Sequence, residues 1–302
     1  MAVVKKKVAP QTSATNESSA ENAAQNASAA VPRYQIPHLA TNKFKPSDNF
    51  FDYNVLIYGQ RKIGKTTLAA ECPDSYFFFF EPNDSYELYK SDIRTWDDFI
   101  FLADEFSKGN HAYRTAIIDT GRPCYDLALQ YACKKHGFEH PGGQNDRGMA
   151  WAKVKTEFEI PVRKLMNAKT GFIVVAHESQ EEVTTRTGQV FHQIRPDLPS
   201  AASRLFANEI YNIFYYYKDD EGRWLQIEGD EYVQCGHRMR GHFLTPAGER
   251  VIRIPMGNSE KDGYRNLMRA FDNKQLNPYV KKGGSTAQSA DEGRKVLKKK
   301  SA

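Results

Sequence analysis

Apolar runs in the middle of the chain alternate with stretches of helical periodicity. The runs are short and almost continuous, and they cover residues 54–58, 76–80, 114–119 and 171–177. Longer stretches between them, above all residues 96–106 and 148–168, repeat apolar side chains at helical spacing. Strands that are apolar along their whole length are typical of parallel sheets covered by helices on both faces. The pattern therefore predicts an α/β fold with a mostly parallel sheet.

One predicted helix contains a proline. Residues 148–168 place a set of large apolar side chains on one face, namely Trp151, Val154, Phe158, Val162, Leu165 and Met166. Pro161 lies among them, and a proline inside a helix removes a backbone hydrogen bond and clashes with the preceding turn. We expect a kink or a break of this helix at Pro161.

The pattern changes in the last third of the chain. Residues 183–186 and 189–194 flank Thr187-Gly188, which is typical of a β-hairpin. Residues 210–217 and 224–227 flank the polar segment 219–222, which predicts a second hairpin. Residues 235–254 are expected to add further strands. The C-terminal third is thus predicted to extend the parallel sheet with antiparallel strands.

The two ends differ from the middle in composition. Residues 9–31 contain no aromatic residue and few large apolar ones, so they cannot bury enough surface to offset the entropy of ordering. We predict a disordered low-complexity tail at 1–45, one folded domain at 46–279, and a disordered basic tail at 280–302. The second tail ends in a cluster of lysines that suits either an arm for DNA or RNA or a solubilising tail.

The positive net charge of +5 is concentrated in the tails. Residues 280–302 carry seven lysines and arginines against two acidic residues, and residues 1–31 carry three lysines against two glutamates. The middle of the chain is therefore close to neutral, at about −1. A strong general affinity of the folded body for nucleic acid is not expected from this balance.

Neither a membrane span nor a disulfide framework is predicted. No apolar run approaches the length of a transmembrane helix, so we expect no contact with a membrane. The four cysteines are scattered without paired spacing, which suits a reducing cytoplasm. Cys235, His237 and His242 lie close in sequence, but a fourth ligand is missing, which disfavours zinc.

The firmest motif in the chain is a phosphate loop. Residues 59–66 match the pattern GxxxxGK[ST], directly after a predicted strand and before a predicted helix. Glycines let the backbone N–H groups turn toward phosphates, and the helix start adds its positive end. Lys65 is expected to reach the β- and γ-phosphates, and the Thr66 hydroxyl to bind Mg²⁺. The predicted cofactors are ATP and Mg²⁺, held by Gly59, Gln60, Arg61, Lys62, Ile63, Gly64, Lys65, Thr66 and Thr67.

Two carboxylates suit the rest of an ATPase site. Asp119 ends the third apolar run, and we expect it to hold Mg²⁺ with Thr66, from the strand next to the phosphate loop. The alternative is a strand-terminating Asp that caps a turn. Many DNA motors place a glutamate directly after this aspartate, but here Thr120 follows. We assign Glu81, at the end of the second apolar run, to orient or deprotonate the attacking water; the alternative is an exposed loop carboxylate.

His177 ends the fourth apolar run. A polar group there is placed to contact the γ-phosphate and to report its loss to the segment behind it, which contains Arg186, His192 and Arg195. The alternative is a structural histidine with no role in catalysis.

These segments together resemble a known group. Residues 57–59, 64–69, 80–81, 117–120 and 175–178, with looser matches at 146–151, 195–198 and 263–267, are similar to the RecA-like AAA-type ATPases of bacteriophages, which are related to phage single-strand annealing and recombination proteins. The resemblance covers about residues 50–272. It implies a RecA-like core, ATP hydrolysis coupled to homo-oligomer state, and contact with single-stranded DNA in the cytoplasm of a bacterial host.

The resemblance also implies roles for particular residues. It maps the catalytic glutamate onto Glu81 and the γ-phosphate sensor onto His177, and it maps DNA-contacting loops onto residues 179–200. The candidate DNA contacts there are Arg186, Phe191, His192 and Arg195. A single-strand DNA-binding protein is a possible partner. Whether a neighbouring subunit supplies an arginine stays open, with Arg204 and Arg238 as the candidates.

Other functions of a phosphate loop were weighed against this one. A nucleotide kinase needs a lid with paired arginines, and the sequence shows no clear arginine-rich lid. A GTPase is disfavoured because residues 167–170 do not match the motif that reads guanine. A scaffold that uses ATP only to control assembly stays open.

Overall fold

The computed structural model describes residues 42–83 and 86–275. The chain divides into two units, Met1–Pro46 and Ser47–Ala302, and every helix and strand reported below lies in the second. The tails predicted at 1–45 and 280–302 lie almost entirely outside the described residues.

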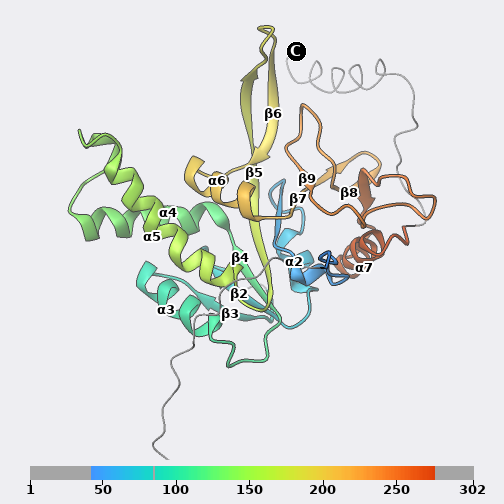
Figure 1. Cartoon of the computed structure of the whole chain (residues 1–302), viewed down its shortest axis with the longest axis horizontal. Helices are drawn as coiled ribbons and strands as arrows, with labels where there is room; N and C mark the ends of the chain where they lie inside the picture. Colours follow the sequence, from blue (N-terminus) through green and yellow to red (C-terminus); the bar gives the residue numbers. More distant parts are fainter. Residues whose placement is uncertain (1–41, 84–85, 276–302) are drawn as a thin grey trace, which may run out of the picture. The chain divides into compact units, whose positions relative to one another are not determined.

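Six parallel strands form the centre of the main sheet (Figure 1). In spatial order the sheet runs β10-β8-β7-β1-β5-β4-β2-β3, and the strands from β7 to β3 are parallel. Their bounds are β1 (Val55–Gly59), β2 (Ser75–Phe79), β3 (Tyr89–Asp92), β4 (Thr115–Asp119), β5 (Gly171–Thr184), β7 (Asn212–Asp219), β8 (Gly222–Gln226) and β10 (Arg253–Pro255). The predicted α/β fold with a mostly parallel sheet and antiparallel strands in its C-terminal part is confirmed.

The strand order corrects one prediction about Asp119. We expected its strand to lie next to the phosphate-loop strand, but β5 lies between β1 and β4. β5 pairs with β1 on one side and with β4 on the other, so Ile173 faces both Val55 and Ile117 in register. Strand adjacency is set by long-range pairing and not by order along the chain. All three strands still end at the same edge of the sheet.

Helices cover both faces of the sheet, as the continuous apolar strands predicted. One face is covered by α3 (Trp96–Ser107), α4 (Gly121–His136), α5 (Met149–Met166) and α6 (Ser200–Glu209). The other carries α2 (Lys65–Ala70) and α7 (Glu260–Phe271). Trp96 and Phe158 are buried in the first layer, and Leu68 and Leu267 in the second. Burial of each such side chain contributes roughly 1.5–3 kcal/mol of hydrophobic free energy.

The helix α5 continues through its proline. Of the predicted kink or break at Pro161, the break is wrong, because one helix runs over Met149–Met166 with the proline buried inside it, and the kink stays a prediction. The lost backbone hydrogen bond and the clash cost about 3 kcal/mol. The buried face of α5, with Val154, Phe158, Val162 and Leu165, offsets this cost by packing on the sheet.

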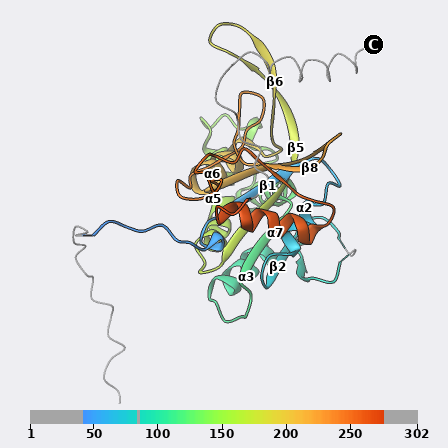
Figure 2. The same cartoon turned by 90° about the vertical axis from the view of Figure 1, so that its right-hand side faces the viewer.

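A β-hairpin projects from the carboxyl end of β5 (Figures 1 and 2). β5 continues past the main sheet to Thr184 and pairs with β6 (Val190–Pro196), so the run predicted at 171–177 and the first two residues of the run predicted at 183–186 belong to one strand. The second predicted hairpin is also present, formed by β7 and β8. Residues 235–254 contain only the two-residue strand β9 (Gly236–His237) and the start of β10, with an isolated bridge from Leu244 to Arg250.

Candidate nucleotide-binding site

The phosphate loop connects β1 to α2 at the carboxyl edge of the sheet. Gly59 pairs with Tyr216 of β7, and a β-carbon on Gly59 would lie 1.8 Å from the Tyr216 carbonyl oxygen. Only glycine therefore fits this end of the loop. Gly64 has a φ of +103°, a backbone conformation that glycine adopts at little cost, and α2 begins at the next residue.

Lys65 is folded back onto the loop that precedes it. Its Nζ donates to the carbonyl oxygens of Gly59 at 2.9 Å and Gln60 at 2.6 Å, and the residue is only 5% exposed. Burial lowers the pKa of Lys65 to about 8, although the charges of Asp119 and Glu178 favour the protonated form. A cation buried against neutral carbonyls gains from any stronger acceptor, and phosphate oxygens are such acceptors.

Thr66 and Asp119 are joined although they lie 53 residues apart. The Thr66 hydroxyl donates to the Asp119 Oδ2 at 2.6 Å. Asp119 is 5% exposed, and burial raises its pKa to about 6, against the lowering effects of the Thr66 hydrogen bond and the Lys65 charge. A hydroxyl and a carboxylate at one point are hard oxygen ligands of the kind that Mg²⁺ prefers. This pair fits the predicted magnesium ion.

Glu81 lies near Asp119, two residues after the end of the neighbouring strand β2. Phe79 pairs in register with Asp119, so Glu81 follows β2 at the same edge of the sheet. The Thr120 hydroxyl donates to the Glu81 Oε2 over a long 3.5 Å. The Glu81 side chain is exposed, so it lies on the solvent side of the predicted metal ligands.

His177 is placed opposite the start of the phosphate loop. It pairs in register with Gly59, and its imidazole is half-buried. Burial lowers the pKa of His177, and the charges of Lys65 and Arg61 add to this effect. Its Nδ1 is buried and has no hydrogen-bond partner among the described residues. The arrangement leaves a neutral ring nitrogen ready to bind a polar group.

Lys65, Thr66, Asp119 and His177 line a cavity of about 410 Å³, whereas Glu81 does not line it. Its wall is formed by Lys62, Ile63, Gly64, Lys65, Thr66, Thr67, Asn83, Tyr86, Asp119, Thr120, Val175, His177, Arg223 and Glu260. Gly59, Gln60 and Arg61 of the predicted loop do not line it. Gln60 instead accepts a hydrogen bond from the Lys218 backbone at 3.2 Å, and Arg61 is exposed.

A comparison with families of known proteins decides the class. A family model described as an AAA domain matches residues 52–241, which is more than half of the chain. The chain belongs to this AAA domain family. Its members are in general nucleotide-binding ATPases that typically use ATP with Mg²⁺. No curated protein matches the chain. No helix in the described part of the chain has both the length and the apolar character needed to cross a membrane.

Six residues that line the cavity were not predicted as site residues: Asn83, Tyr86, Thr120 and Val175, which lie within five positions of predicted ones, and Arg223 and Glu260. Arg223 in β8 and Glu260 at the start of α7 line the cavity from the C-terminal part of the chain. Glu260 lies beyond the matched AAA domain. Arg223 and Glu260 are about 160 and 200 residues away from the phosphate loop, and neither belongs to a short motif. Arg223 reaches the cavity because β8 pairs with β7, which lies beside β1, and Glu260 reaches it because α7 follows β10.

The predicted DNA contacts lie on the projecting hairpin of this AAA domain, and the structure does not bring them together. Arg186 is exposed in the turn, and His192 is exposed on β6. Phe191 packs edge-on against Tyr232, with ring centroids 5.7 Å apart, and Arg195 forms an ion pair with Glu181.

The two arginines considered for a neighbouring site both have contacts within their own chain. Arg238 donates to the carbonyl oxygens of Asn208 at 2.9 Å and Ala207 at 2.6 Å, where it satisfies the last turn of α6. Arg204 donates to the Ser200 carbonyl oxygen at 3.3 Å.

Proposed function

We propose that this AAA domain protein hydrolyses ATP in a magnesium-dependent reaction and acts with single-stranded DNA in phage recombination or replication. The observation that carries the enzymatic part is the Thr66–Asp119 hydrogen bond beside the buried Lys65. Buried charged groups with shifted pKa values are costly for a fold and gather at functional sites. Here they meet at the carboxyl edge of a parallel sheet, where ligands bind in open α/β folds.

The proposed reaction divides the work among a few side chains. Lys65 binds the β- and γ-phosphates. Thr66 and Asp119 would hold a magnesium ion, which would supply positive charge against the charge that grows on the phosphate oxygens. Glu81 orients a water molecule and accepts its proton as the water oxygen bonds to the γ-phosphorus. The bond between that phosphorus and the β,γ-bridging oxygen breaks, which yields ADP and inorganic phosphate.

His177 is proposed to couple this reaction to the hairpin. Its neutral ring is available to bind the γ-phosphate, and the same strand leads without a break from His177 into the hairpin. Loss of the γ-phosphate removes that contact and changes the position of the strand end. The coupling therefore needs no additional moving element, because the single strand β5 joins His177 to the hairpin.

The DNA part of the proposal rests on the resemblance and on the exposed hairpin. Arg186 and His192 are exposed and can reach a nucleic acid, whereas the exposed Glu182 repels phosphates and Glu181 is paired with Arg195. We therefore expect weak, salt-sensitive contact with single-stranded DNA by each chain, strengthened when several chains form a homo-oligomer. A single-strand DNA-binding protein is a natural partner for such an assembly.

The test is phosphate release from ATP by the full chain at low salt, with and without single-stranded DNA, beside size-exclusion chromatography with and without ATP. We expect turnover that requires Mg²⁺, rises with DNA, and is lost in Lys65→Ala. Turnover that no nucleic acid changes would remove the DNA part. An intact, folded chain that releases no phosphate under any condition would remove the ATPase itself.

One observation favours a second candidate, an assembly scaffold in which ATP binds without turnover. Glu81 is exposed and contacts Thr120 only at 3.5 Å, so it is not held tightly in the arrangement that a catalytic base needs. A scaffold predicts that Glu81→Gln oligomerises with ATP and functions like the wild type.

A further inference from the structure

The C-terminal part of the chain places an arginine above the phosphate loop. Arg223 Nη1 and Glu260 Oε1 each lie 3.9 Å from the point where a β-carbon of Gly64 would be. Both side chains line the cavity of the phosphate loop and are half-buried. A cationic group is therefore delivered to the loop by the same chain, from a strand that no motif marks.

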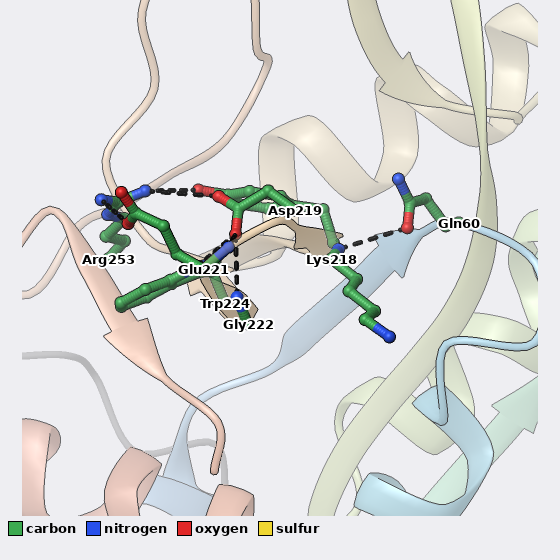
Figure 3. A network of polar contacts seen from close by, with 8 residues as sticks. Gln60, Lys218, Asp219, Glu221, Gly222, Trp224 and Arg253 are labelled. Atoms are coloured by element: carbon green, nitrogen blue, oxygen red, sulfur yellow. Dashed lines mark hydrogen bonds and ion pairs between the residues drawn. The ribbon is translucent and has the colours of Figure 1, made fainter. Parts of the chain in front are cut away.

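The hairpin that carries Arg223 is fixed by a polar network (Figure 3). Asp219 Oδ1 accepts from the backbone N–H groups of Glu221 at 2.9 Å and Gly222 at 3.0 Å, and from Trp224 Nε1 at 2.9 Å. Arg253 lies over the Trp224 ring, 4.2 Å from its centroid, and donates to Glu221 at 3.2 Å. Arg223 lies between Gly222 and Trp224 in this network, so its backbone is held from both sides.

The same hairpin is tied directly to the phosphate loop. The side-chain oxygen of Gln60 accepts the backbone N–H of Lys218, which pairs in register with Arg223. The Arg223 guanidinium also lies near the hydroxyl of the buried Tyr216, where burial raises the pKa of Tyr216 and the Arg223 charge lowers it; the backbone of Tyr216 packs against Gly59. The hairpin that carries Arg223 is thus joined to the loop at Gln60 and packs on it at Gly59.

The Arg223 guanidinium can offer several hydrogen-bond donors to a ligand. It carries five N–H groups in a planar fork that matches phosphate oxygens. Among the residues that the structure describes, no carboxylate oxygen lies within ion-pair distance, 4.0 Å, of Arg223, although Glu260 faces the same space. An arginine that is half-buried, preorganised and without an ion-pair partner is suited to an anionic ligand in the cavity.

We propose that Arg223 binds the α- and β-phosphates of the nucleotide, as a ligand from the same chain. This inference rests on the proposed function, because it takes the cavity to hold ATP. The strand order decides which phosphates it contacts. β8 lies on one side of β1, and β5, β4 and β2, with His177, Asp119 and Glu81, lie on the other. The γ-phosphate faces those three groups, which leaves the α- and β-phosphates nearer to Arg223.

The test is calorimetric titration of the full chain with MgATP and, separately, with MgADP. Arg223→Gln should weaken the binding of both nucleotides by a similar factor, about tenfold or more, since a hydrogen bond to a charged group is worth roughly 1.5–3 kcal/mol. Arg223→Lys keeps the charge without the planar fork and should lie between the wild type and Arg223→Gln. Arg250→Gln is the matched control, because Arg250 is an exposed arginine of the same C-terminal part whose partner is Glu228. It should bind both nucleotides like the wild type.

The outcomes separate this inference from the proposed function. A wild-type chain that binds no ATP overturns the function on which it rests. A wild type that binds ATP, with both Arg223 variants binding equally well, overturns the inference alone. Weaker binding of ATP with unchanged binding of ADP also overturns it, because the contact would then be to the γ-phosphate. Equal melting temperatures of the nucleotide-free variants show that a loss of affinity is not a loss of fold.

Discussion

The two edges of the parallel sheet each carry a cavity, and they differ in what they bury. The cavity at the amino edge is the larger, about 580 Å³ against about 410 Å³ at the carboxyl edge. Its charged lining residues Asp52, Arg114 and Lys169 are all exposed. The carboxyl edge buries both a lysine and an aspartate, Lys65 and Asp119, each only 5% exposed.

Because of this difference we place the candidate site by the convergence of buried charged groups and not by the volume of the cavity. The same parallel strands begin at one edge and end at the other, so the packing of the sheet does not distinguish the two edges. Burial of a charge is unfavourable for the fold unless a partner or a ligand compensates it. The exposed charged groups of the amino edge avoid this penalty, whereas the buried Lys65 and Asp119 lie at the carboxyl edge.

The largest expected effect is that of Lys65→Met on the carboxyl edge. Removal of the ammonium should lower ATP turnover by about 10²–10³-fold or more, the range for loss of one preorganised group that stabilises transition-state charge. The nucleotide-free variant should melt no lower than the wild type, because the buried ammonium is itself unfavourable. Steady-state turnover and thermal melting measure the two effects. At the amino edge, Arg114→Gln is the control, and an equal loss of turnover there would contradict the comparison.

The pH dependence of stability is a second test of the buried Lys65 at the carboxyl edge. The folded-state pKa of Lys65, about 8, lies below the usual value, so between pH 8 and 10 the unfolded chain binds more protons than the folded chain. Stability of the wild type relative to Lys65→Met should therefore rise as the pH rises through this range. A flat difference between the two melting curves would show that Lys65 is not desolvated.

A smaller but sharper effect is expected for Glu81→Gln. Loss of the proton acceptor should lower turnover by about 10²–10⁴-fold, as for a general base, and leave ATP affinity close to the wild type. Single-turnover hydrolysis and equilibrium binding separate these two quantities. Glu71→Gln is a suitable control, because Glu71 follows α2 at its far end. Wild-type turnover in Glu81→Gln would favour the scaffold function or a different base.

The comparison also explains what sequence reasoning was able to predict. The phosphate loop, the strand that ends at Asp119, the apolar run before His177 and the hairpins are set by local sequence patterns, which do not depend on distant contacts. The place of β5 between β1 and β4 depends on pairing between residues more than 50 positions apart. The continuation of α5 through Pro161 depends on the packing of its buried face, which propensity does not contain. Arg223 and Glu260 reach the cavity only through the antiparallel strands, so no spacing signalled them.

A moderate effect is expected for His177. His177→Ala should lower turnover by about tenfold, since one hydrogen bond to a charged phosphate is lost, and His177→Gln should keep most of it by supplying a neutral donor. Because burial lowers the pKa of His177, the imidazole is neutral at pH 7. The wild type and His177→Gln should therefore show the same pH profile between pH 7 and 8. A profile that changes only in the wild type over this range would mean that the charged form is the active one.

The smallest effect is expected on the projecting hairpin, at Arg186→Ala. Arg186 is exposed in the turn and Arg195 is paired with Glu181, so we expect Arg186 to contribute most of the proposed contact of the hairpin with phosphates. Its loss should lower the slope of log affinity against log salt for single-stranded DNA by about 0.7, the value for one released counterion. Fluorescence anisotropy over a range of salt concentrations measures this slope, with Lys218→Ala, outside the hairpin, as the comparison. An unchanged slope in Arg186→Ala would place DNA contact elsewhere than on this hairpin, while the carboxyl-edge site would still bind and hydrolyse ATP without it.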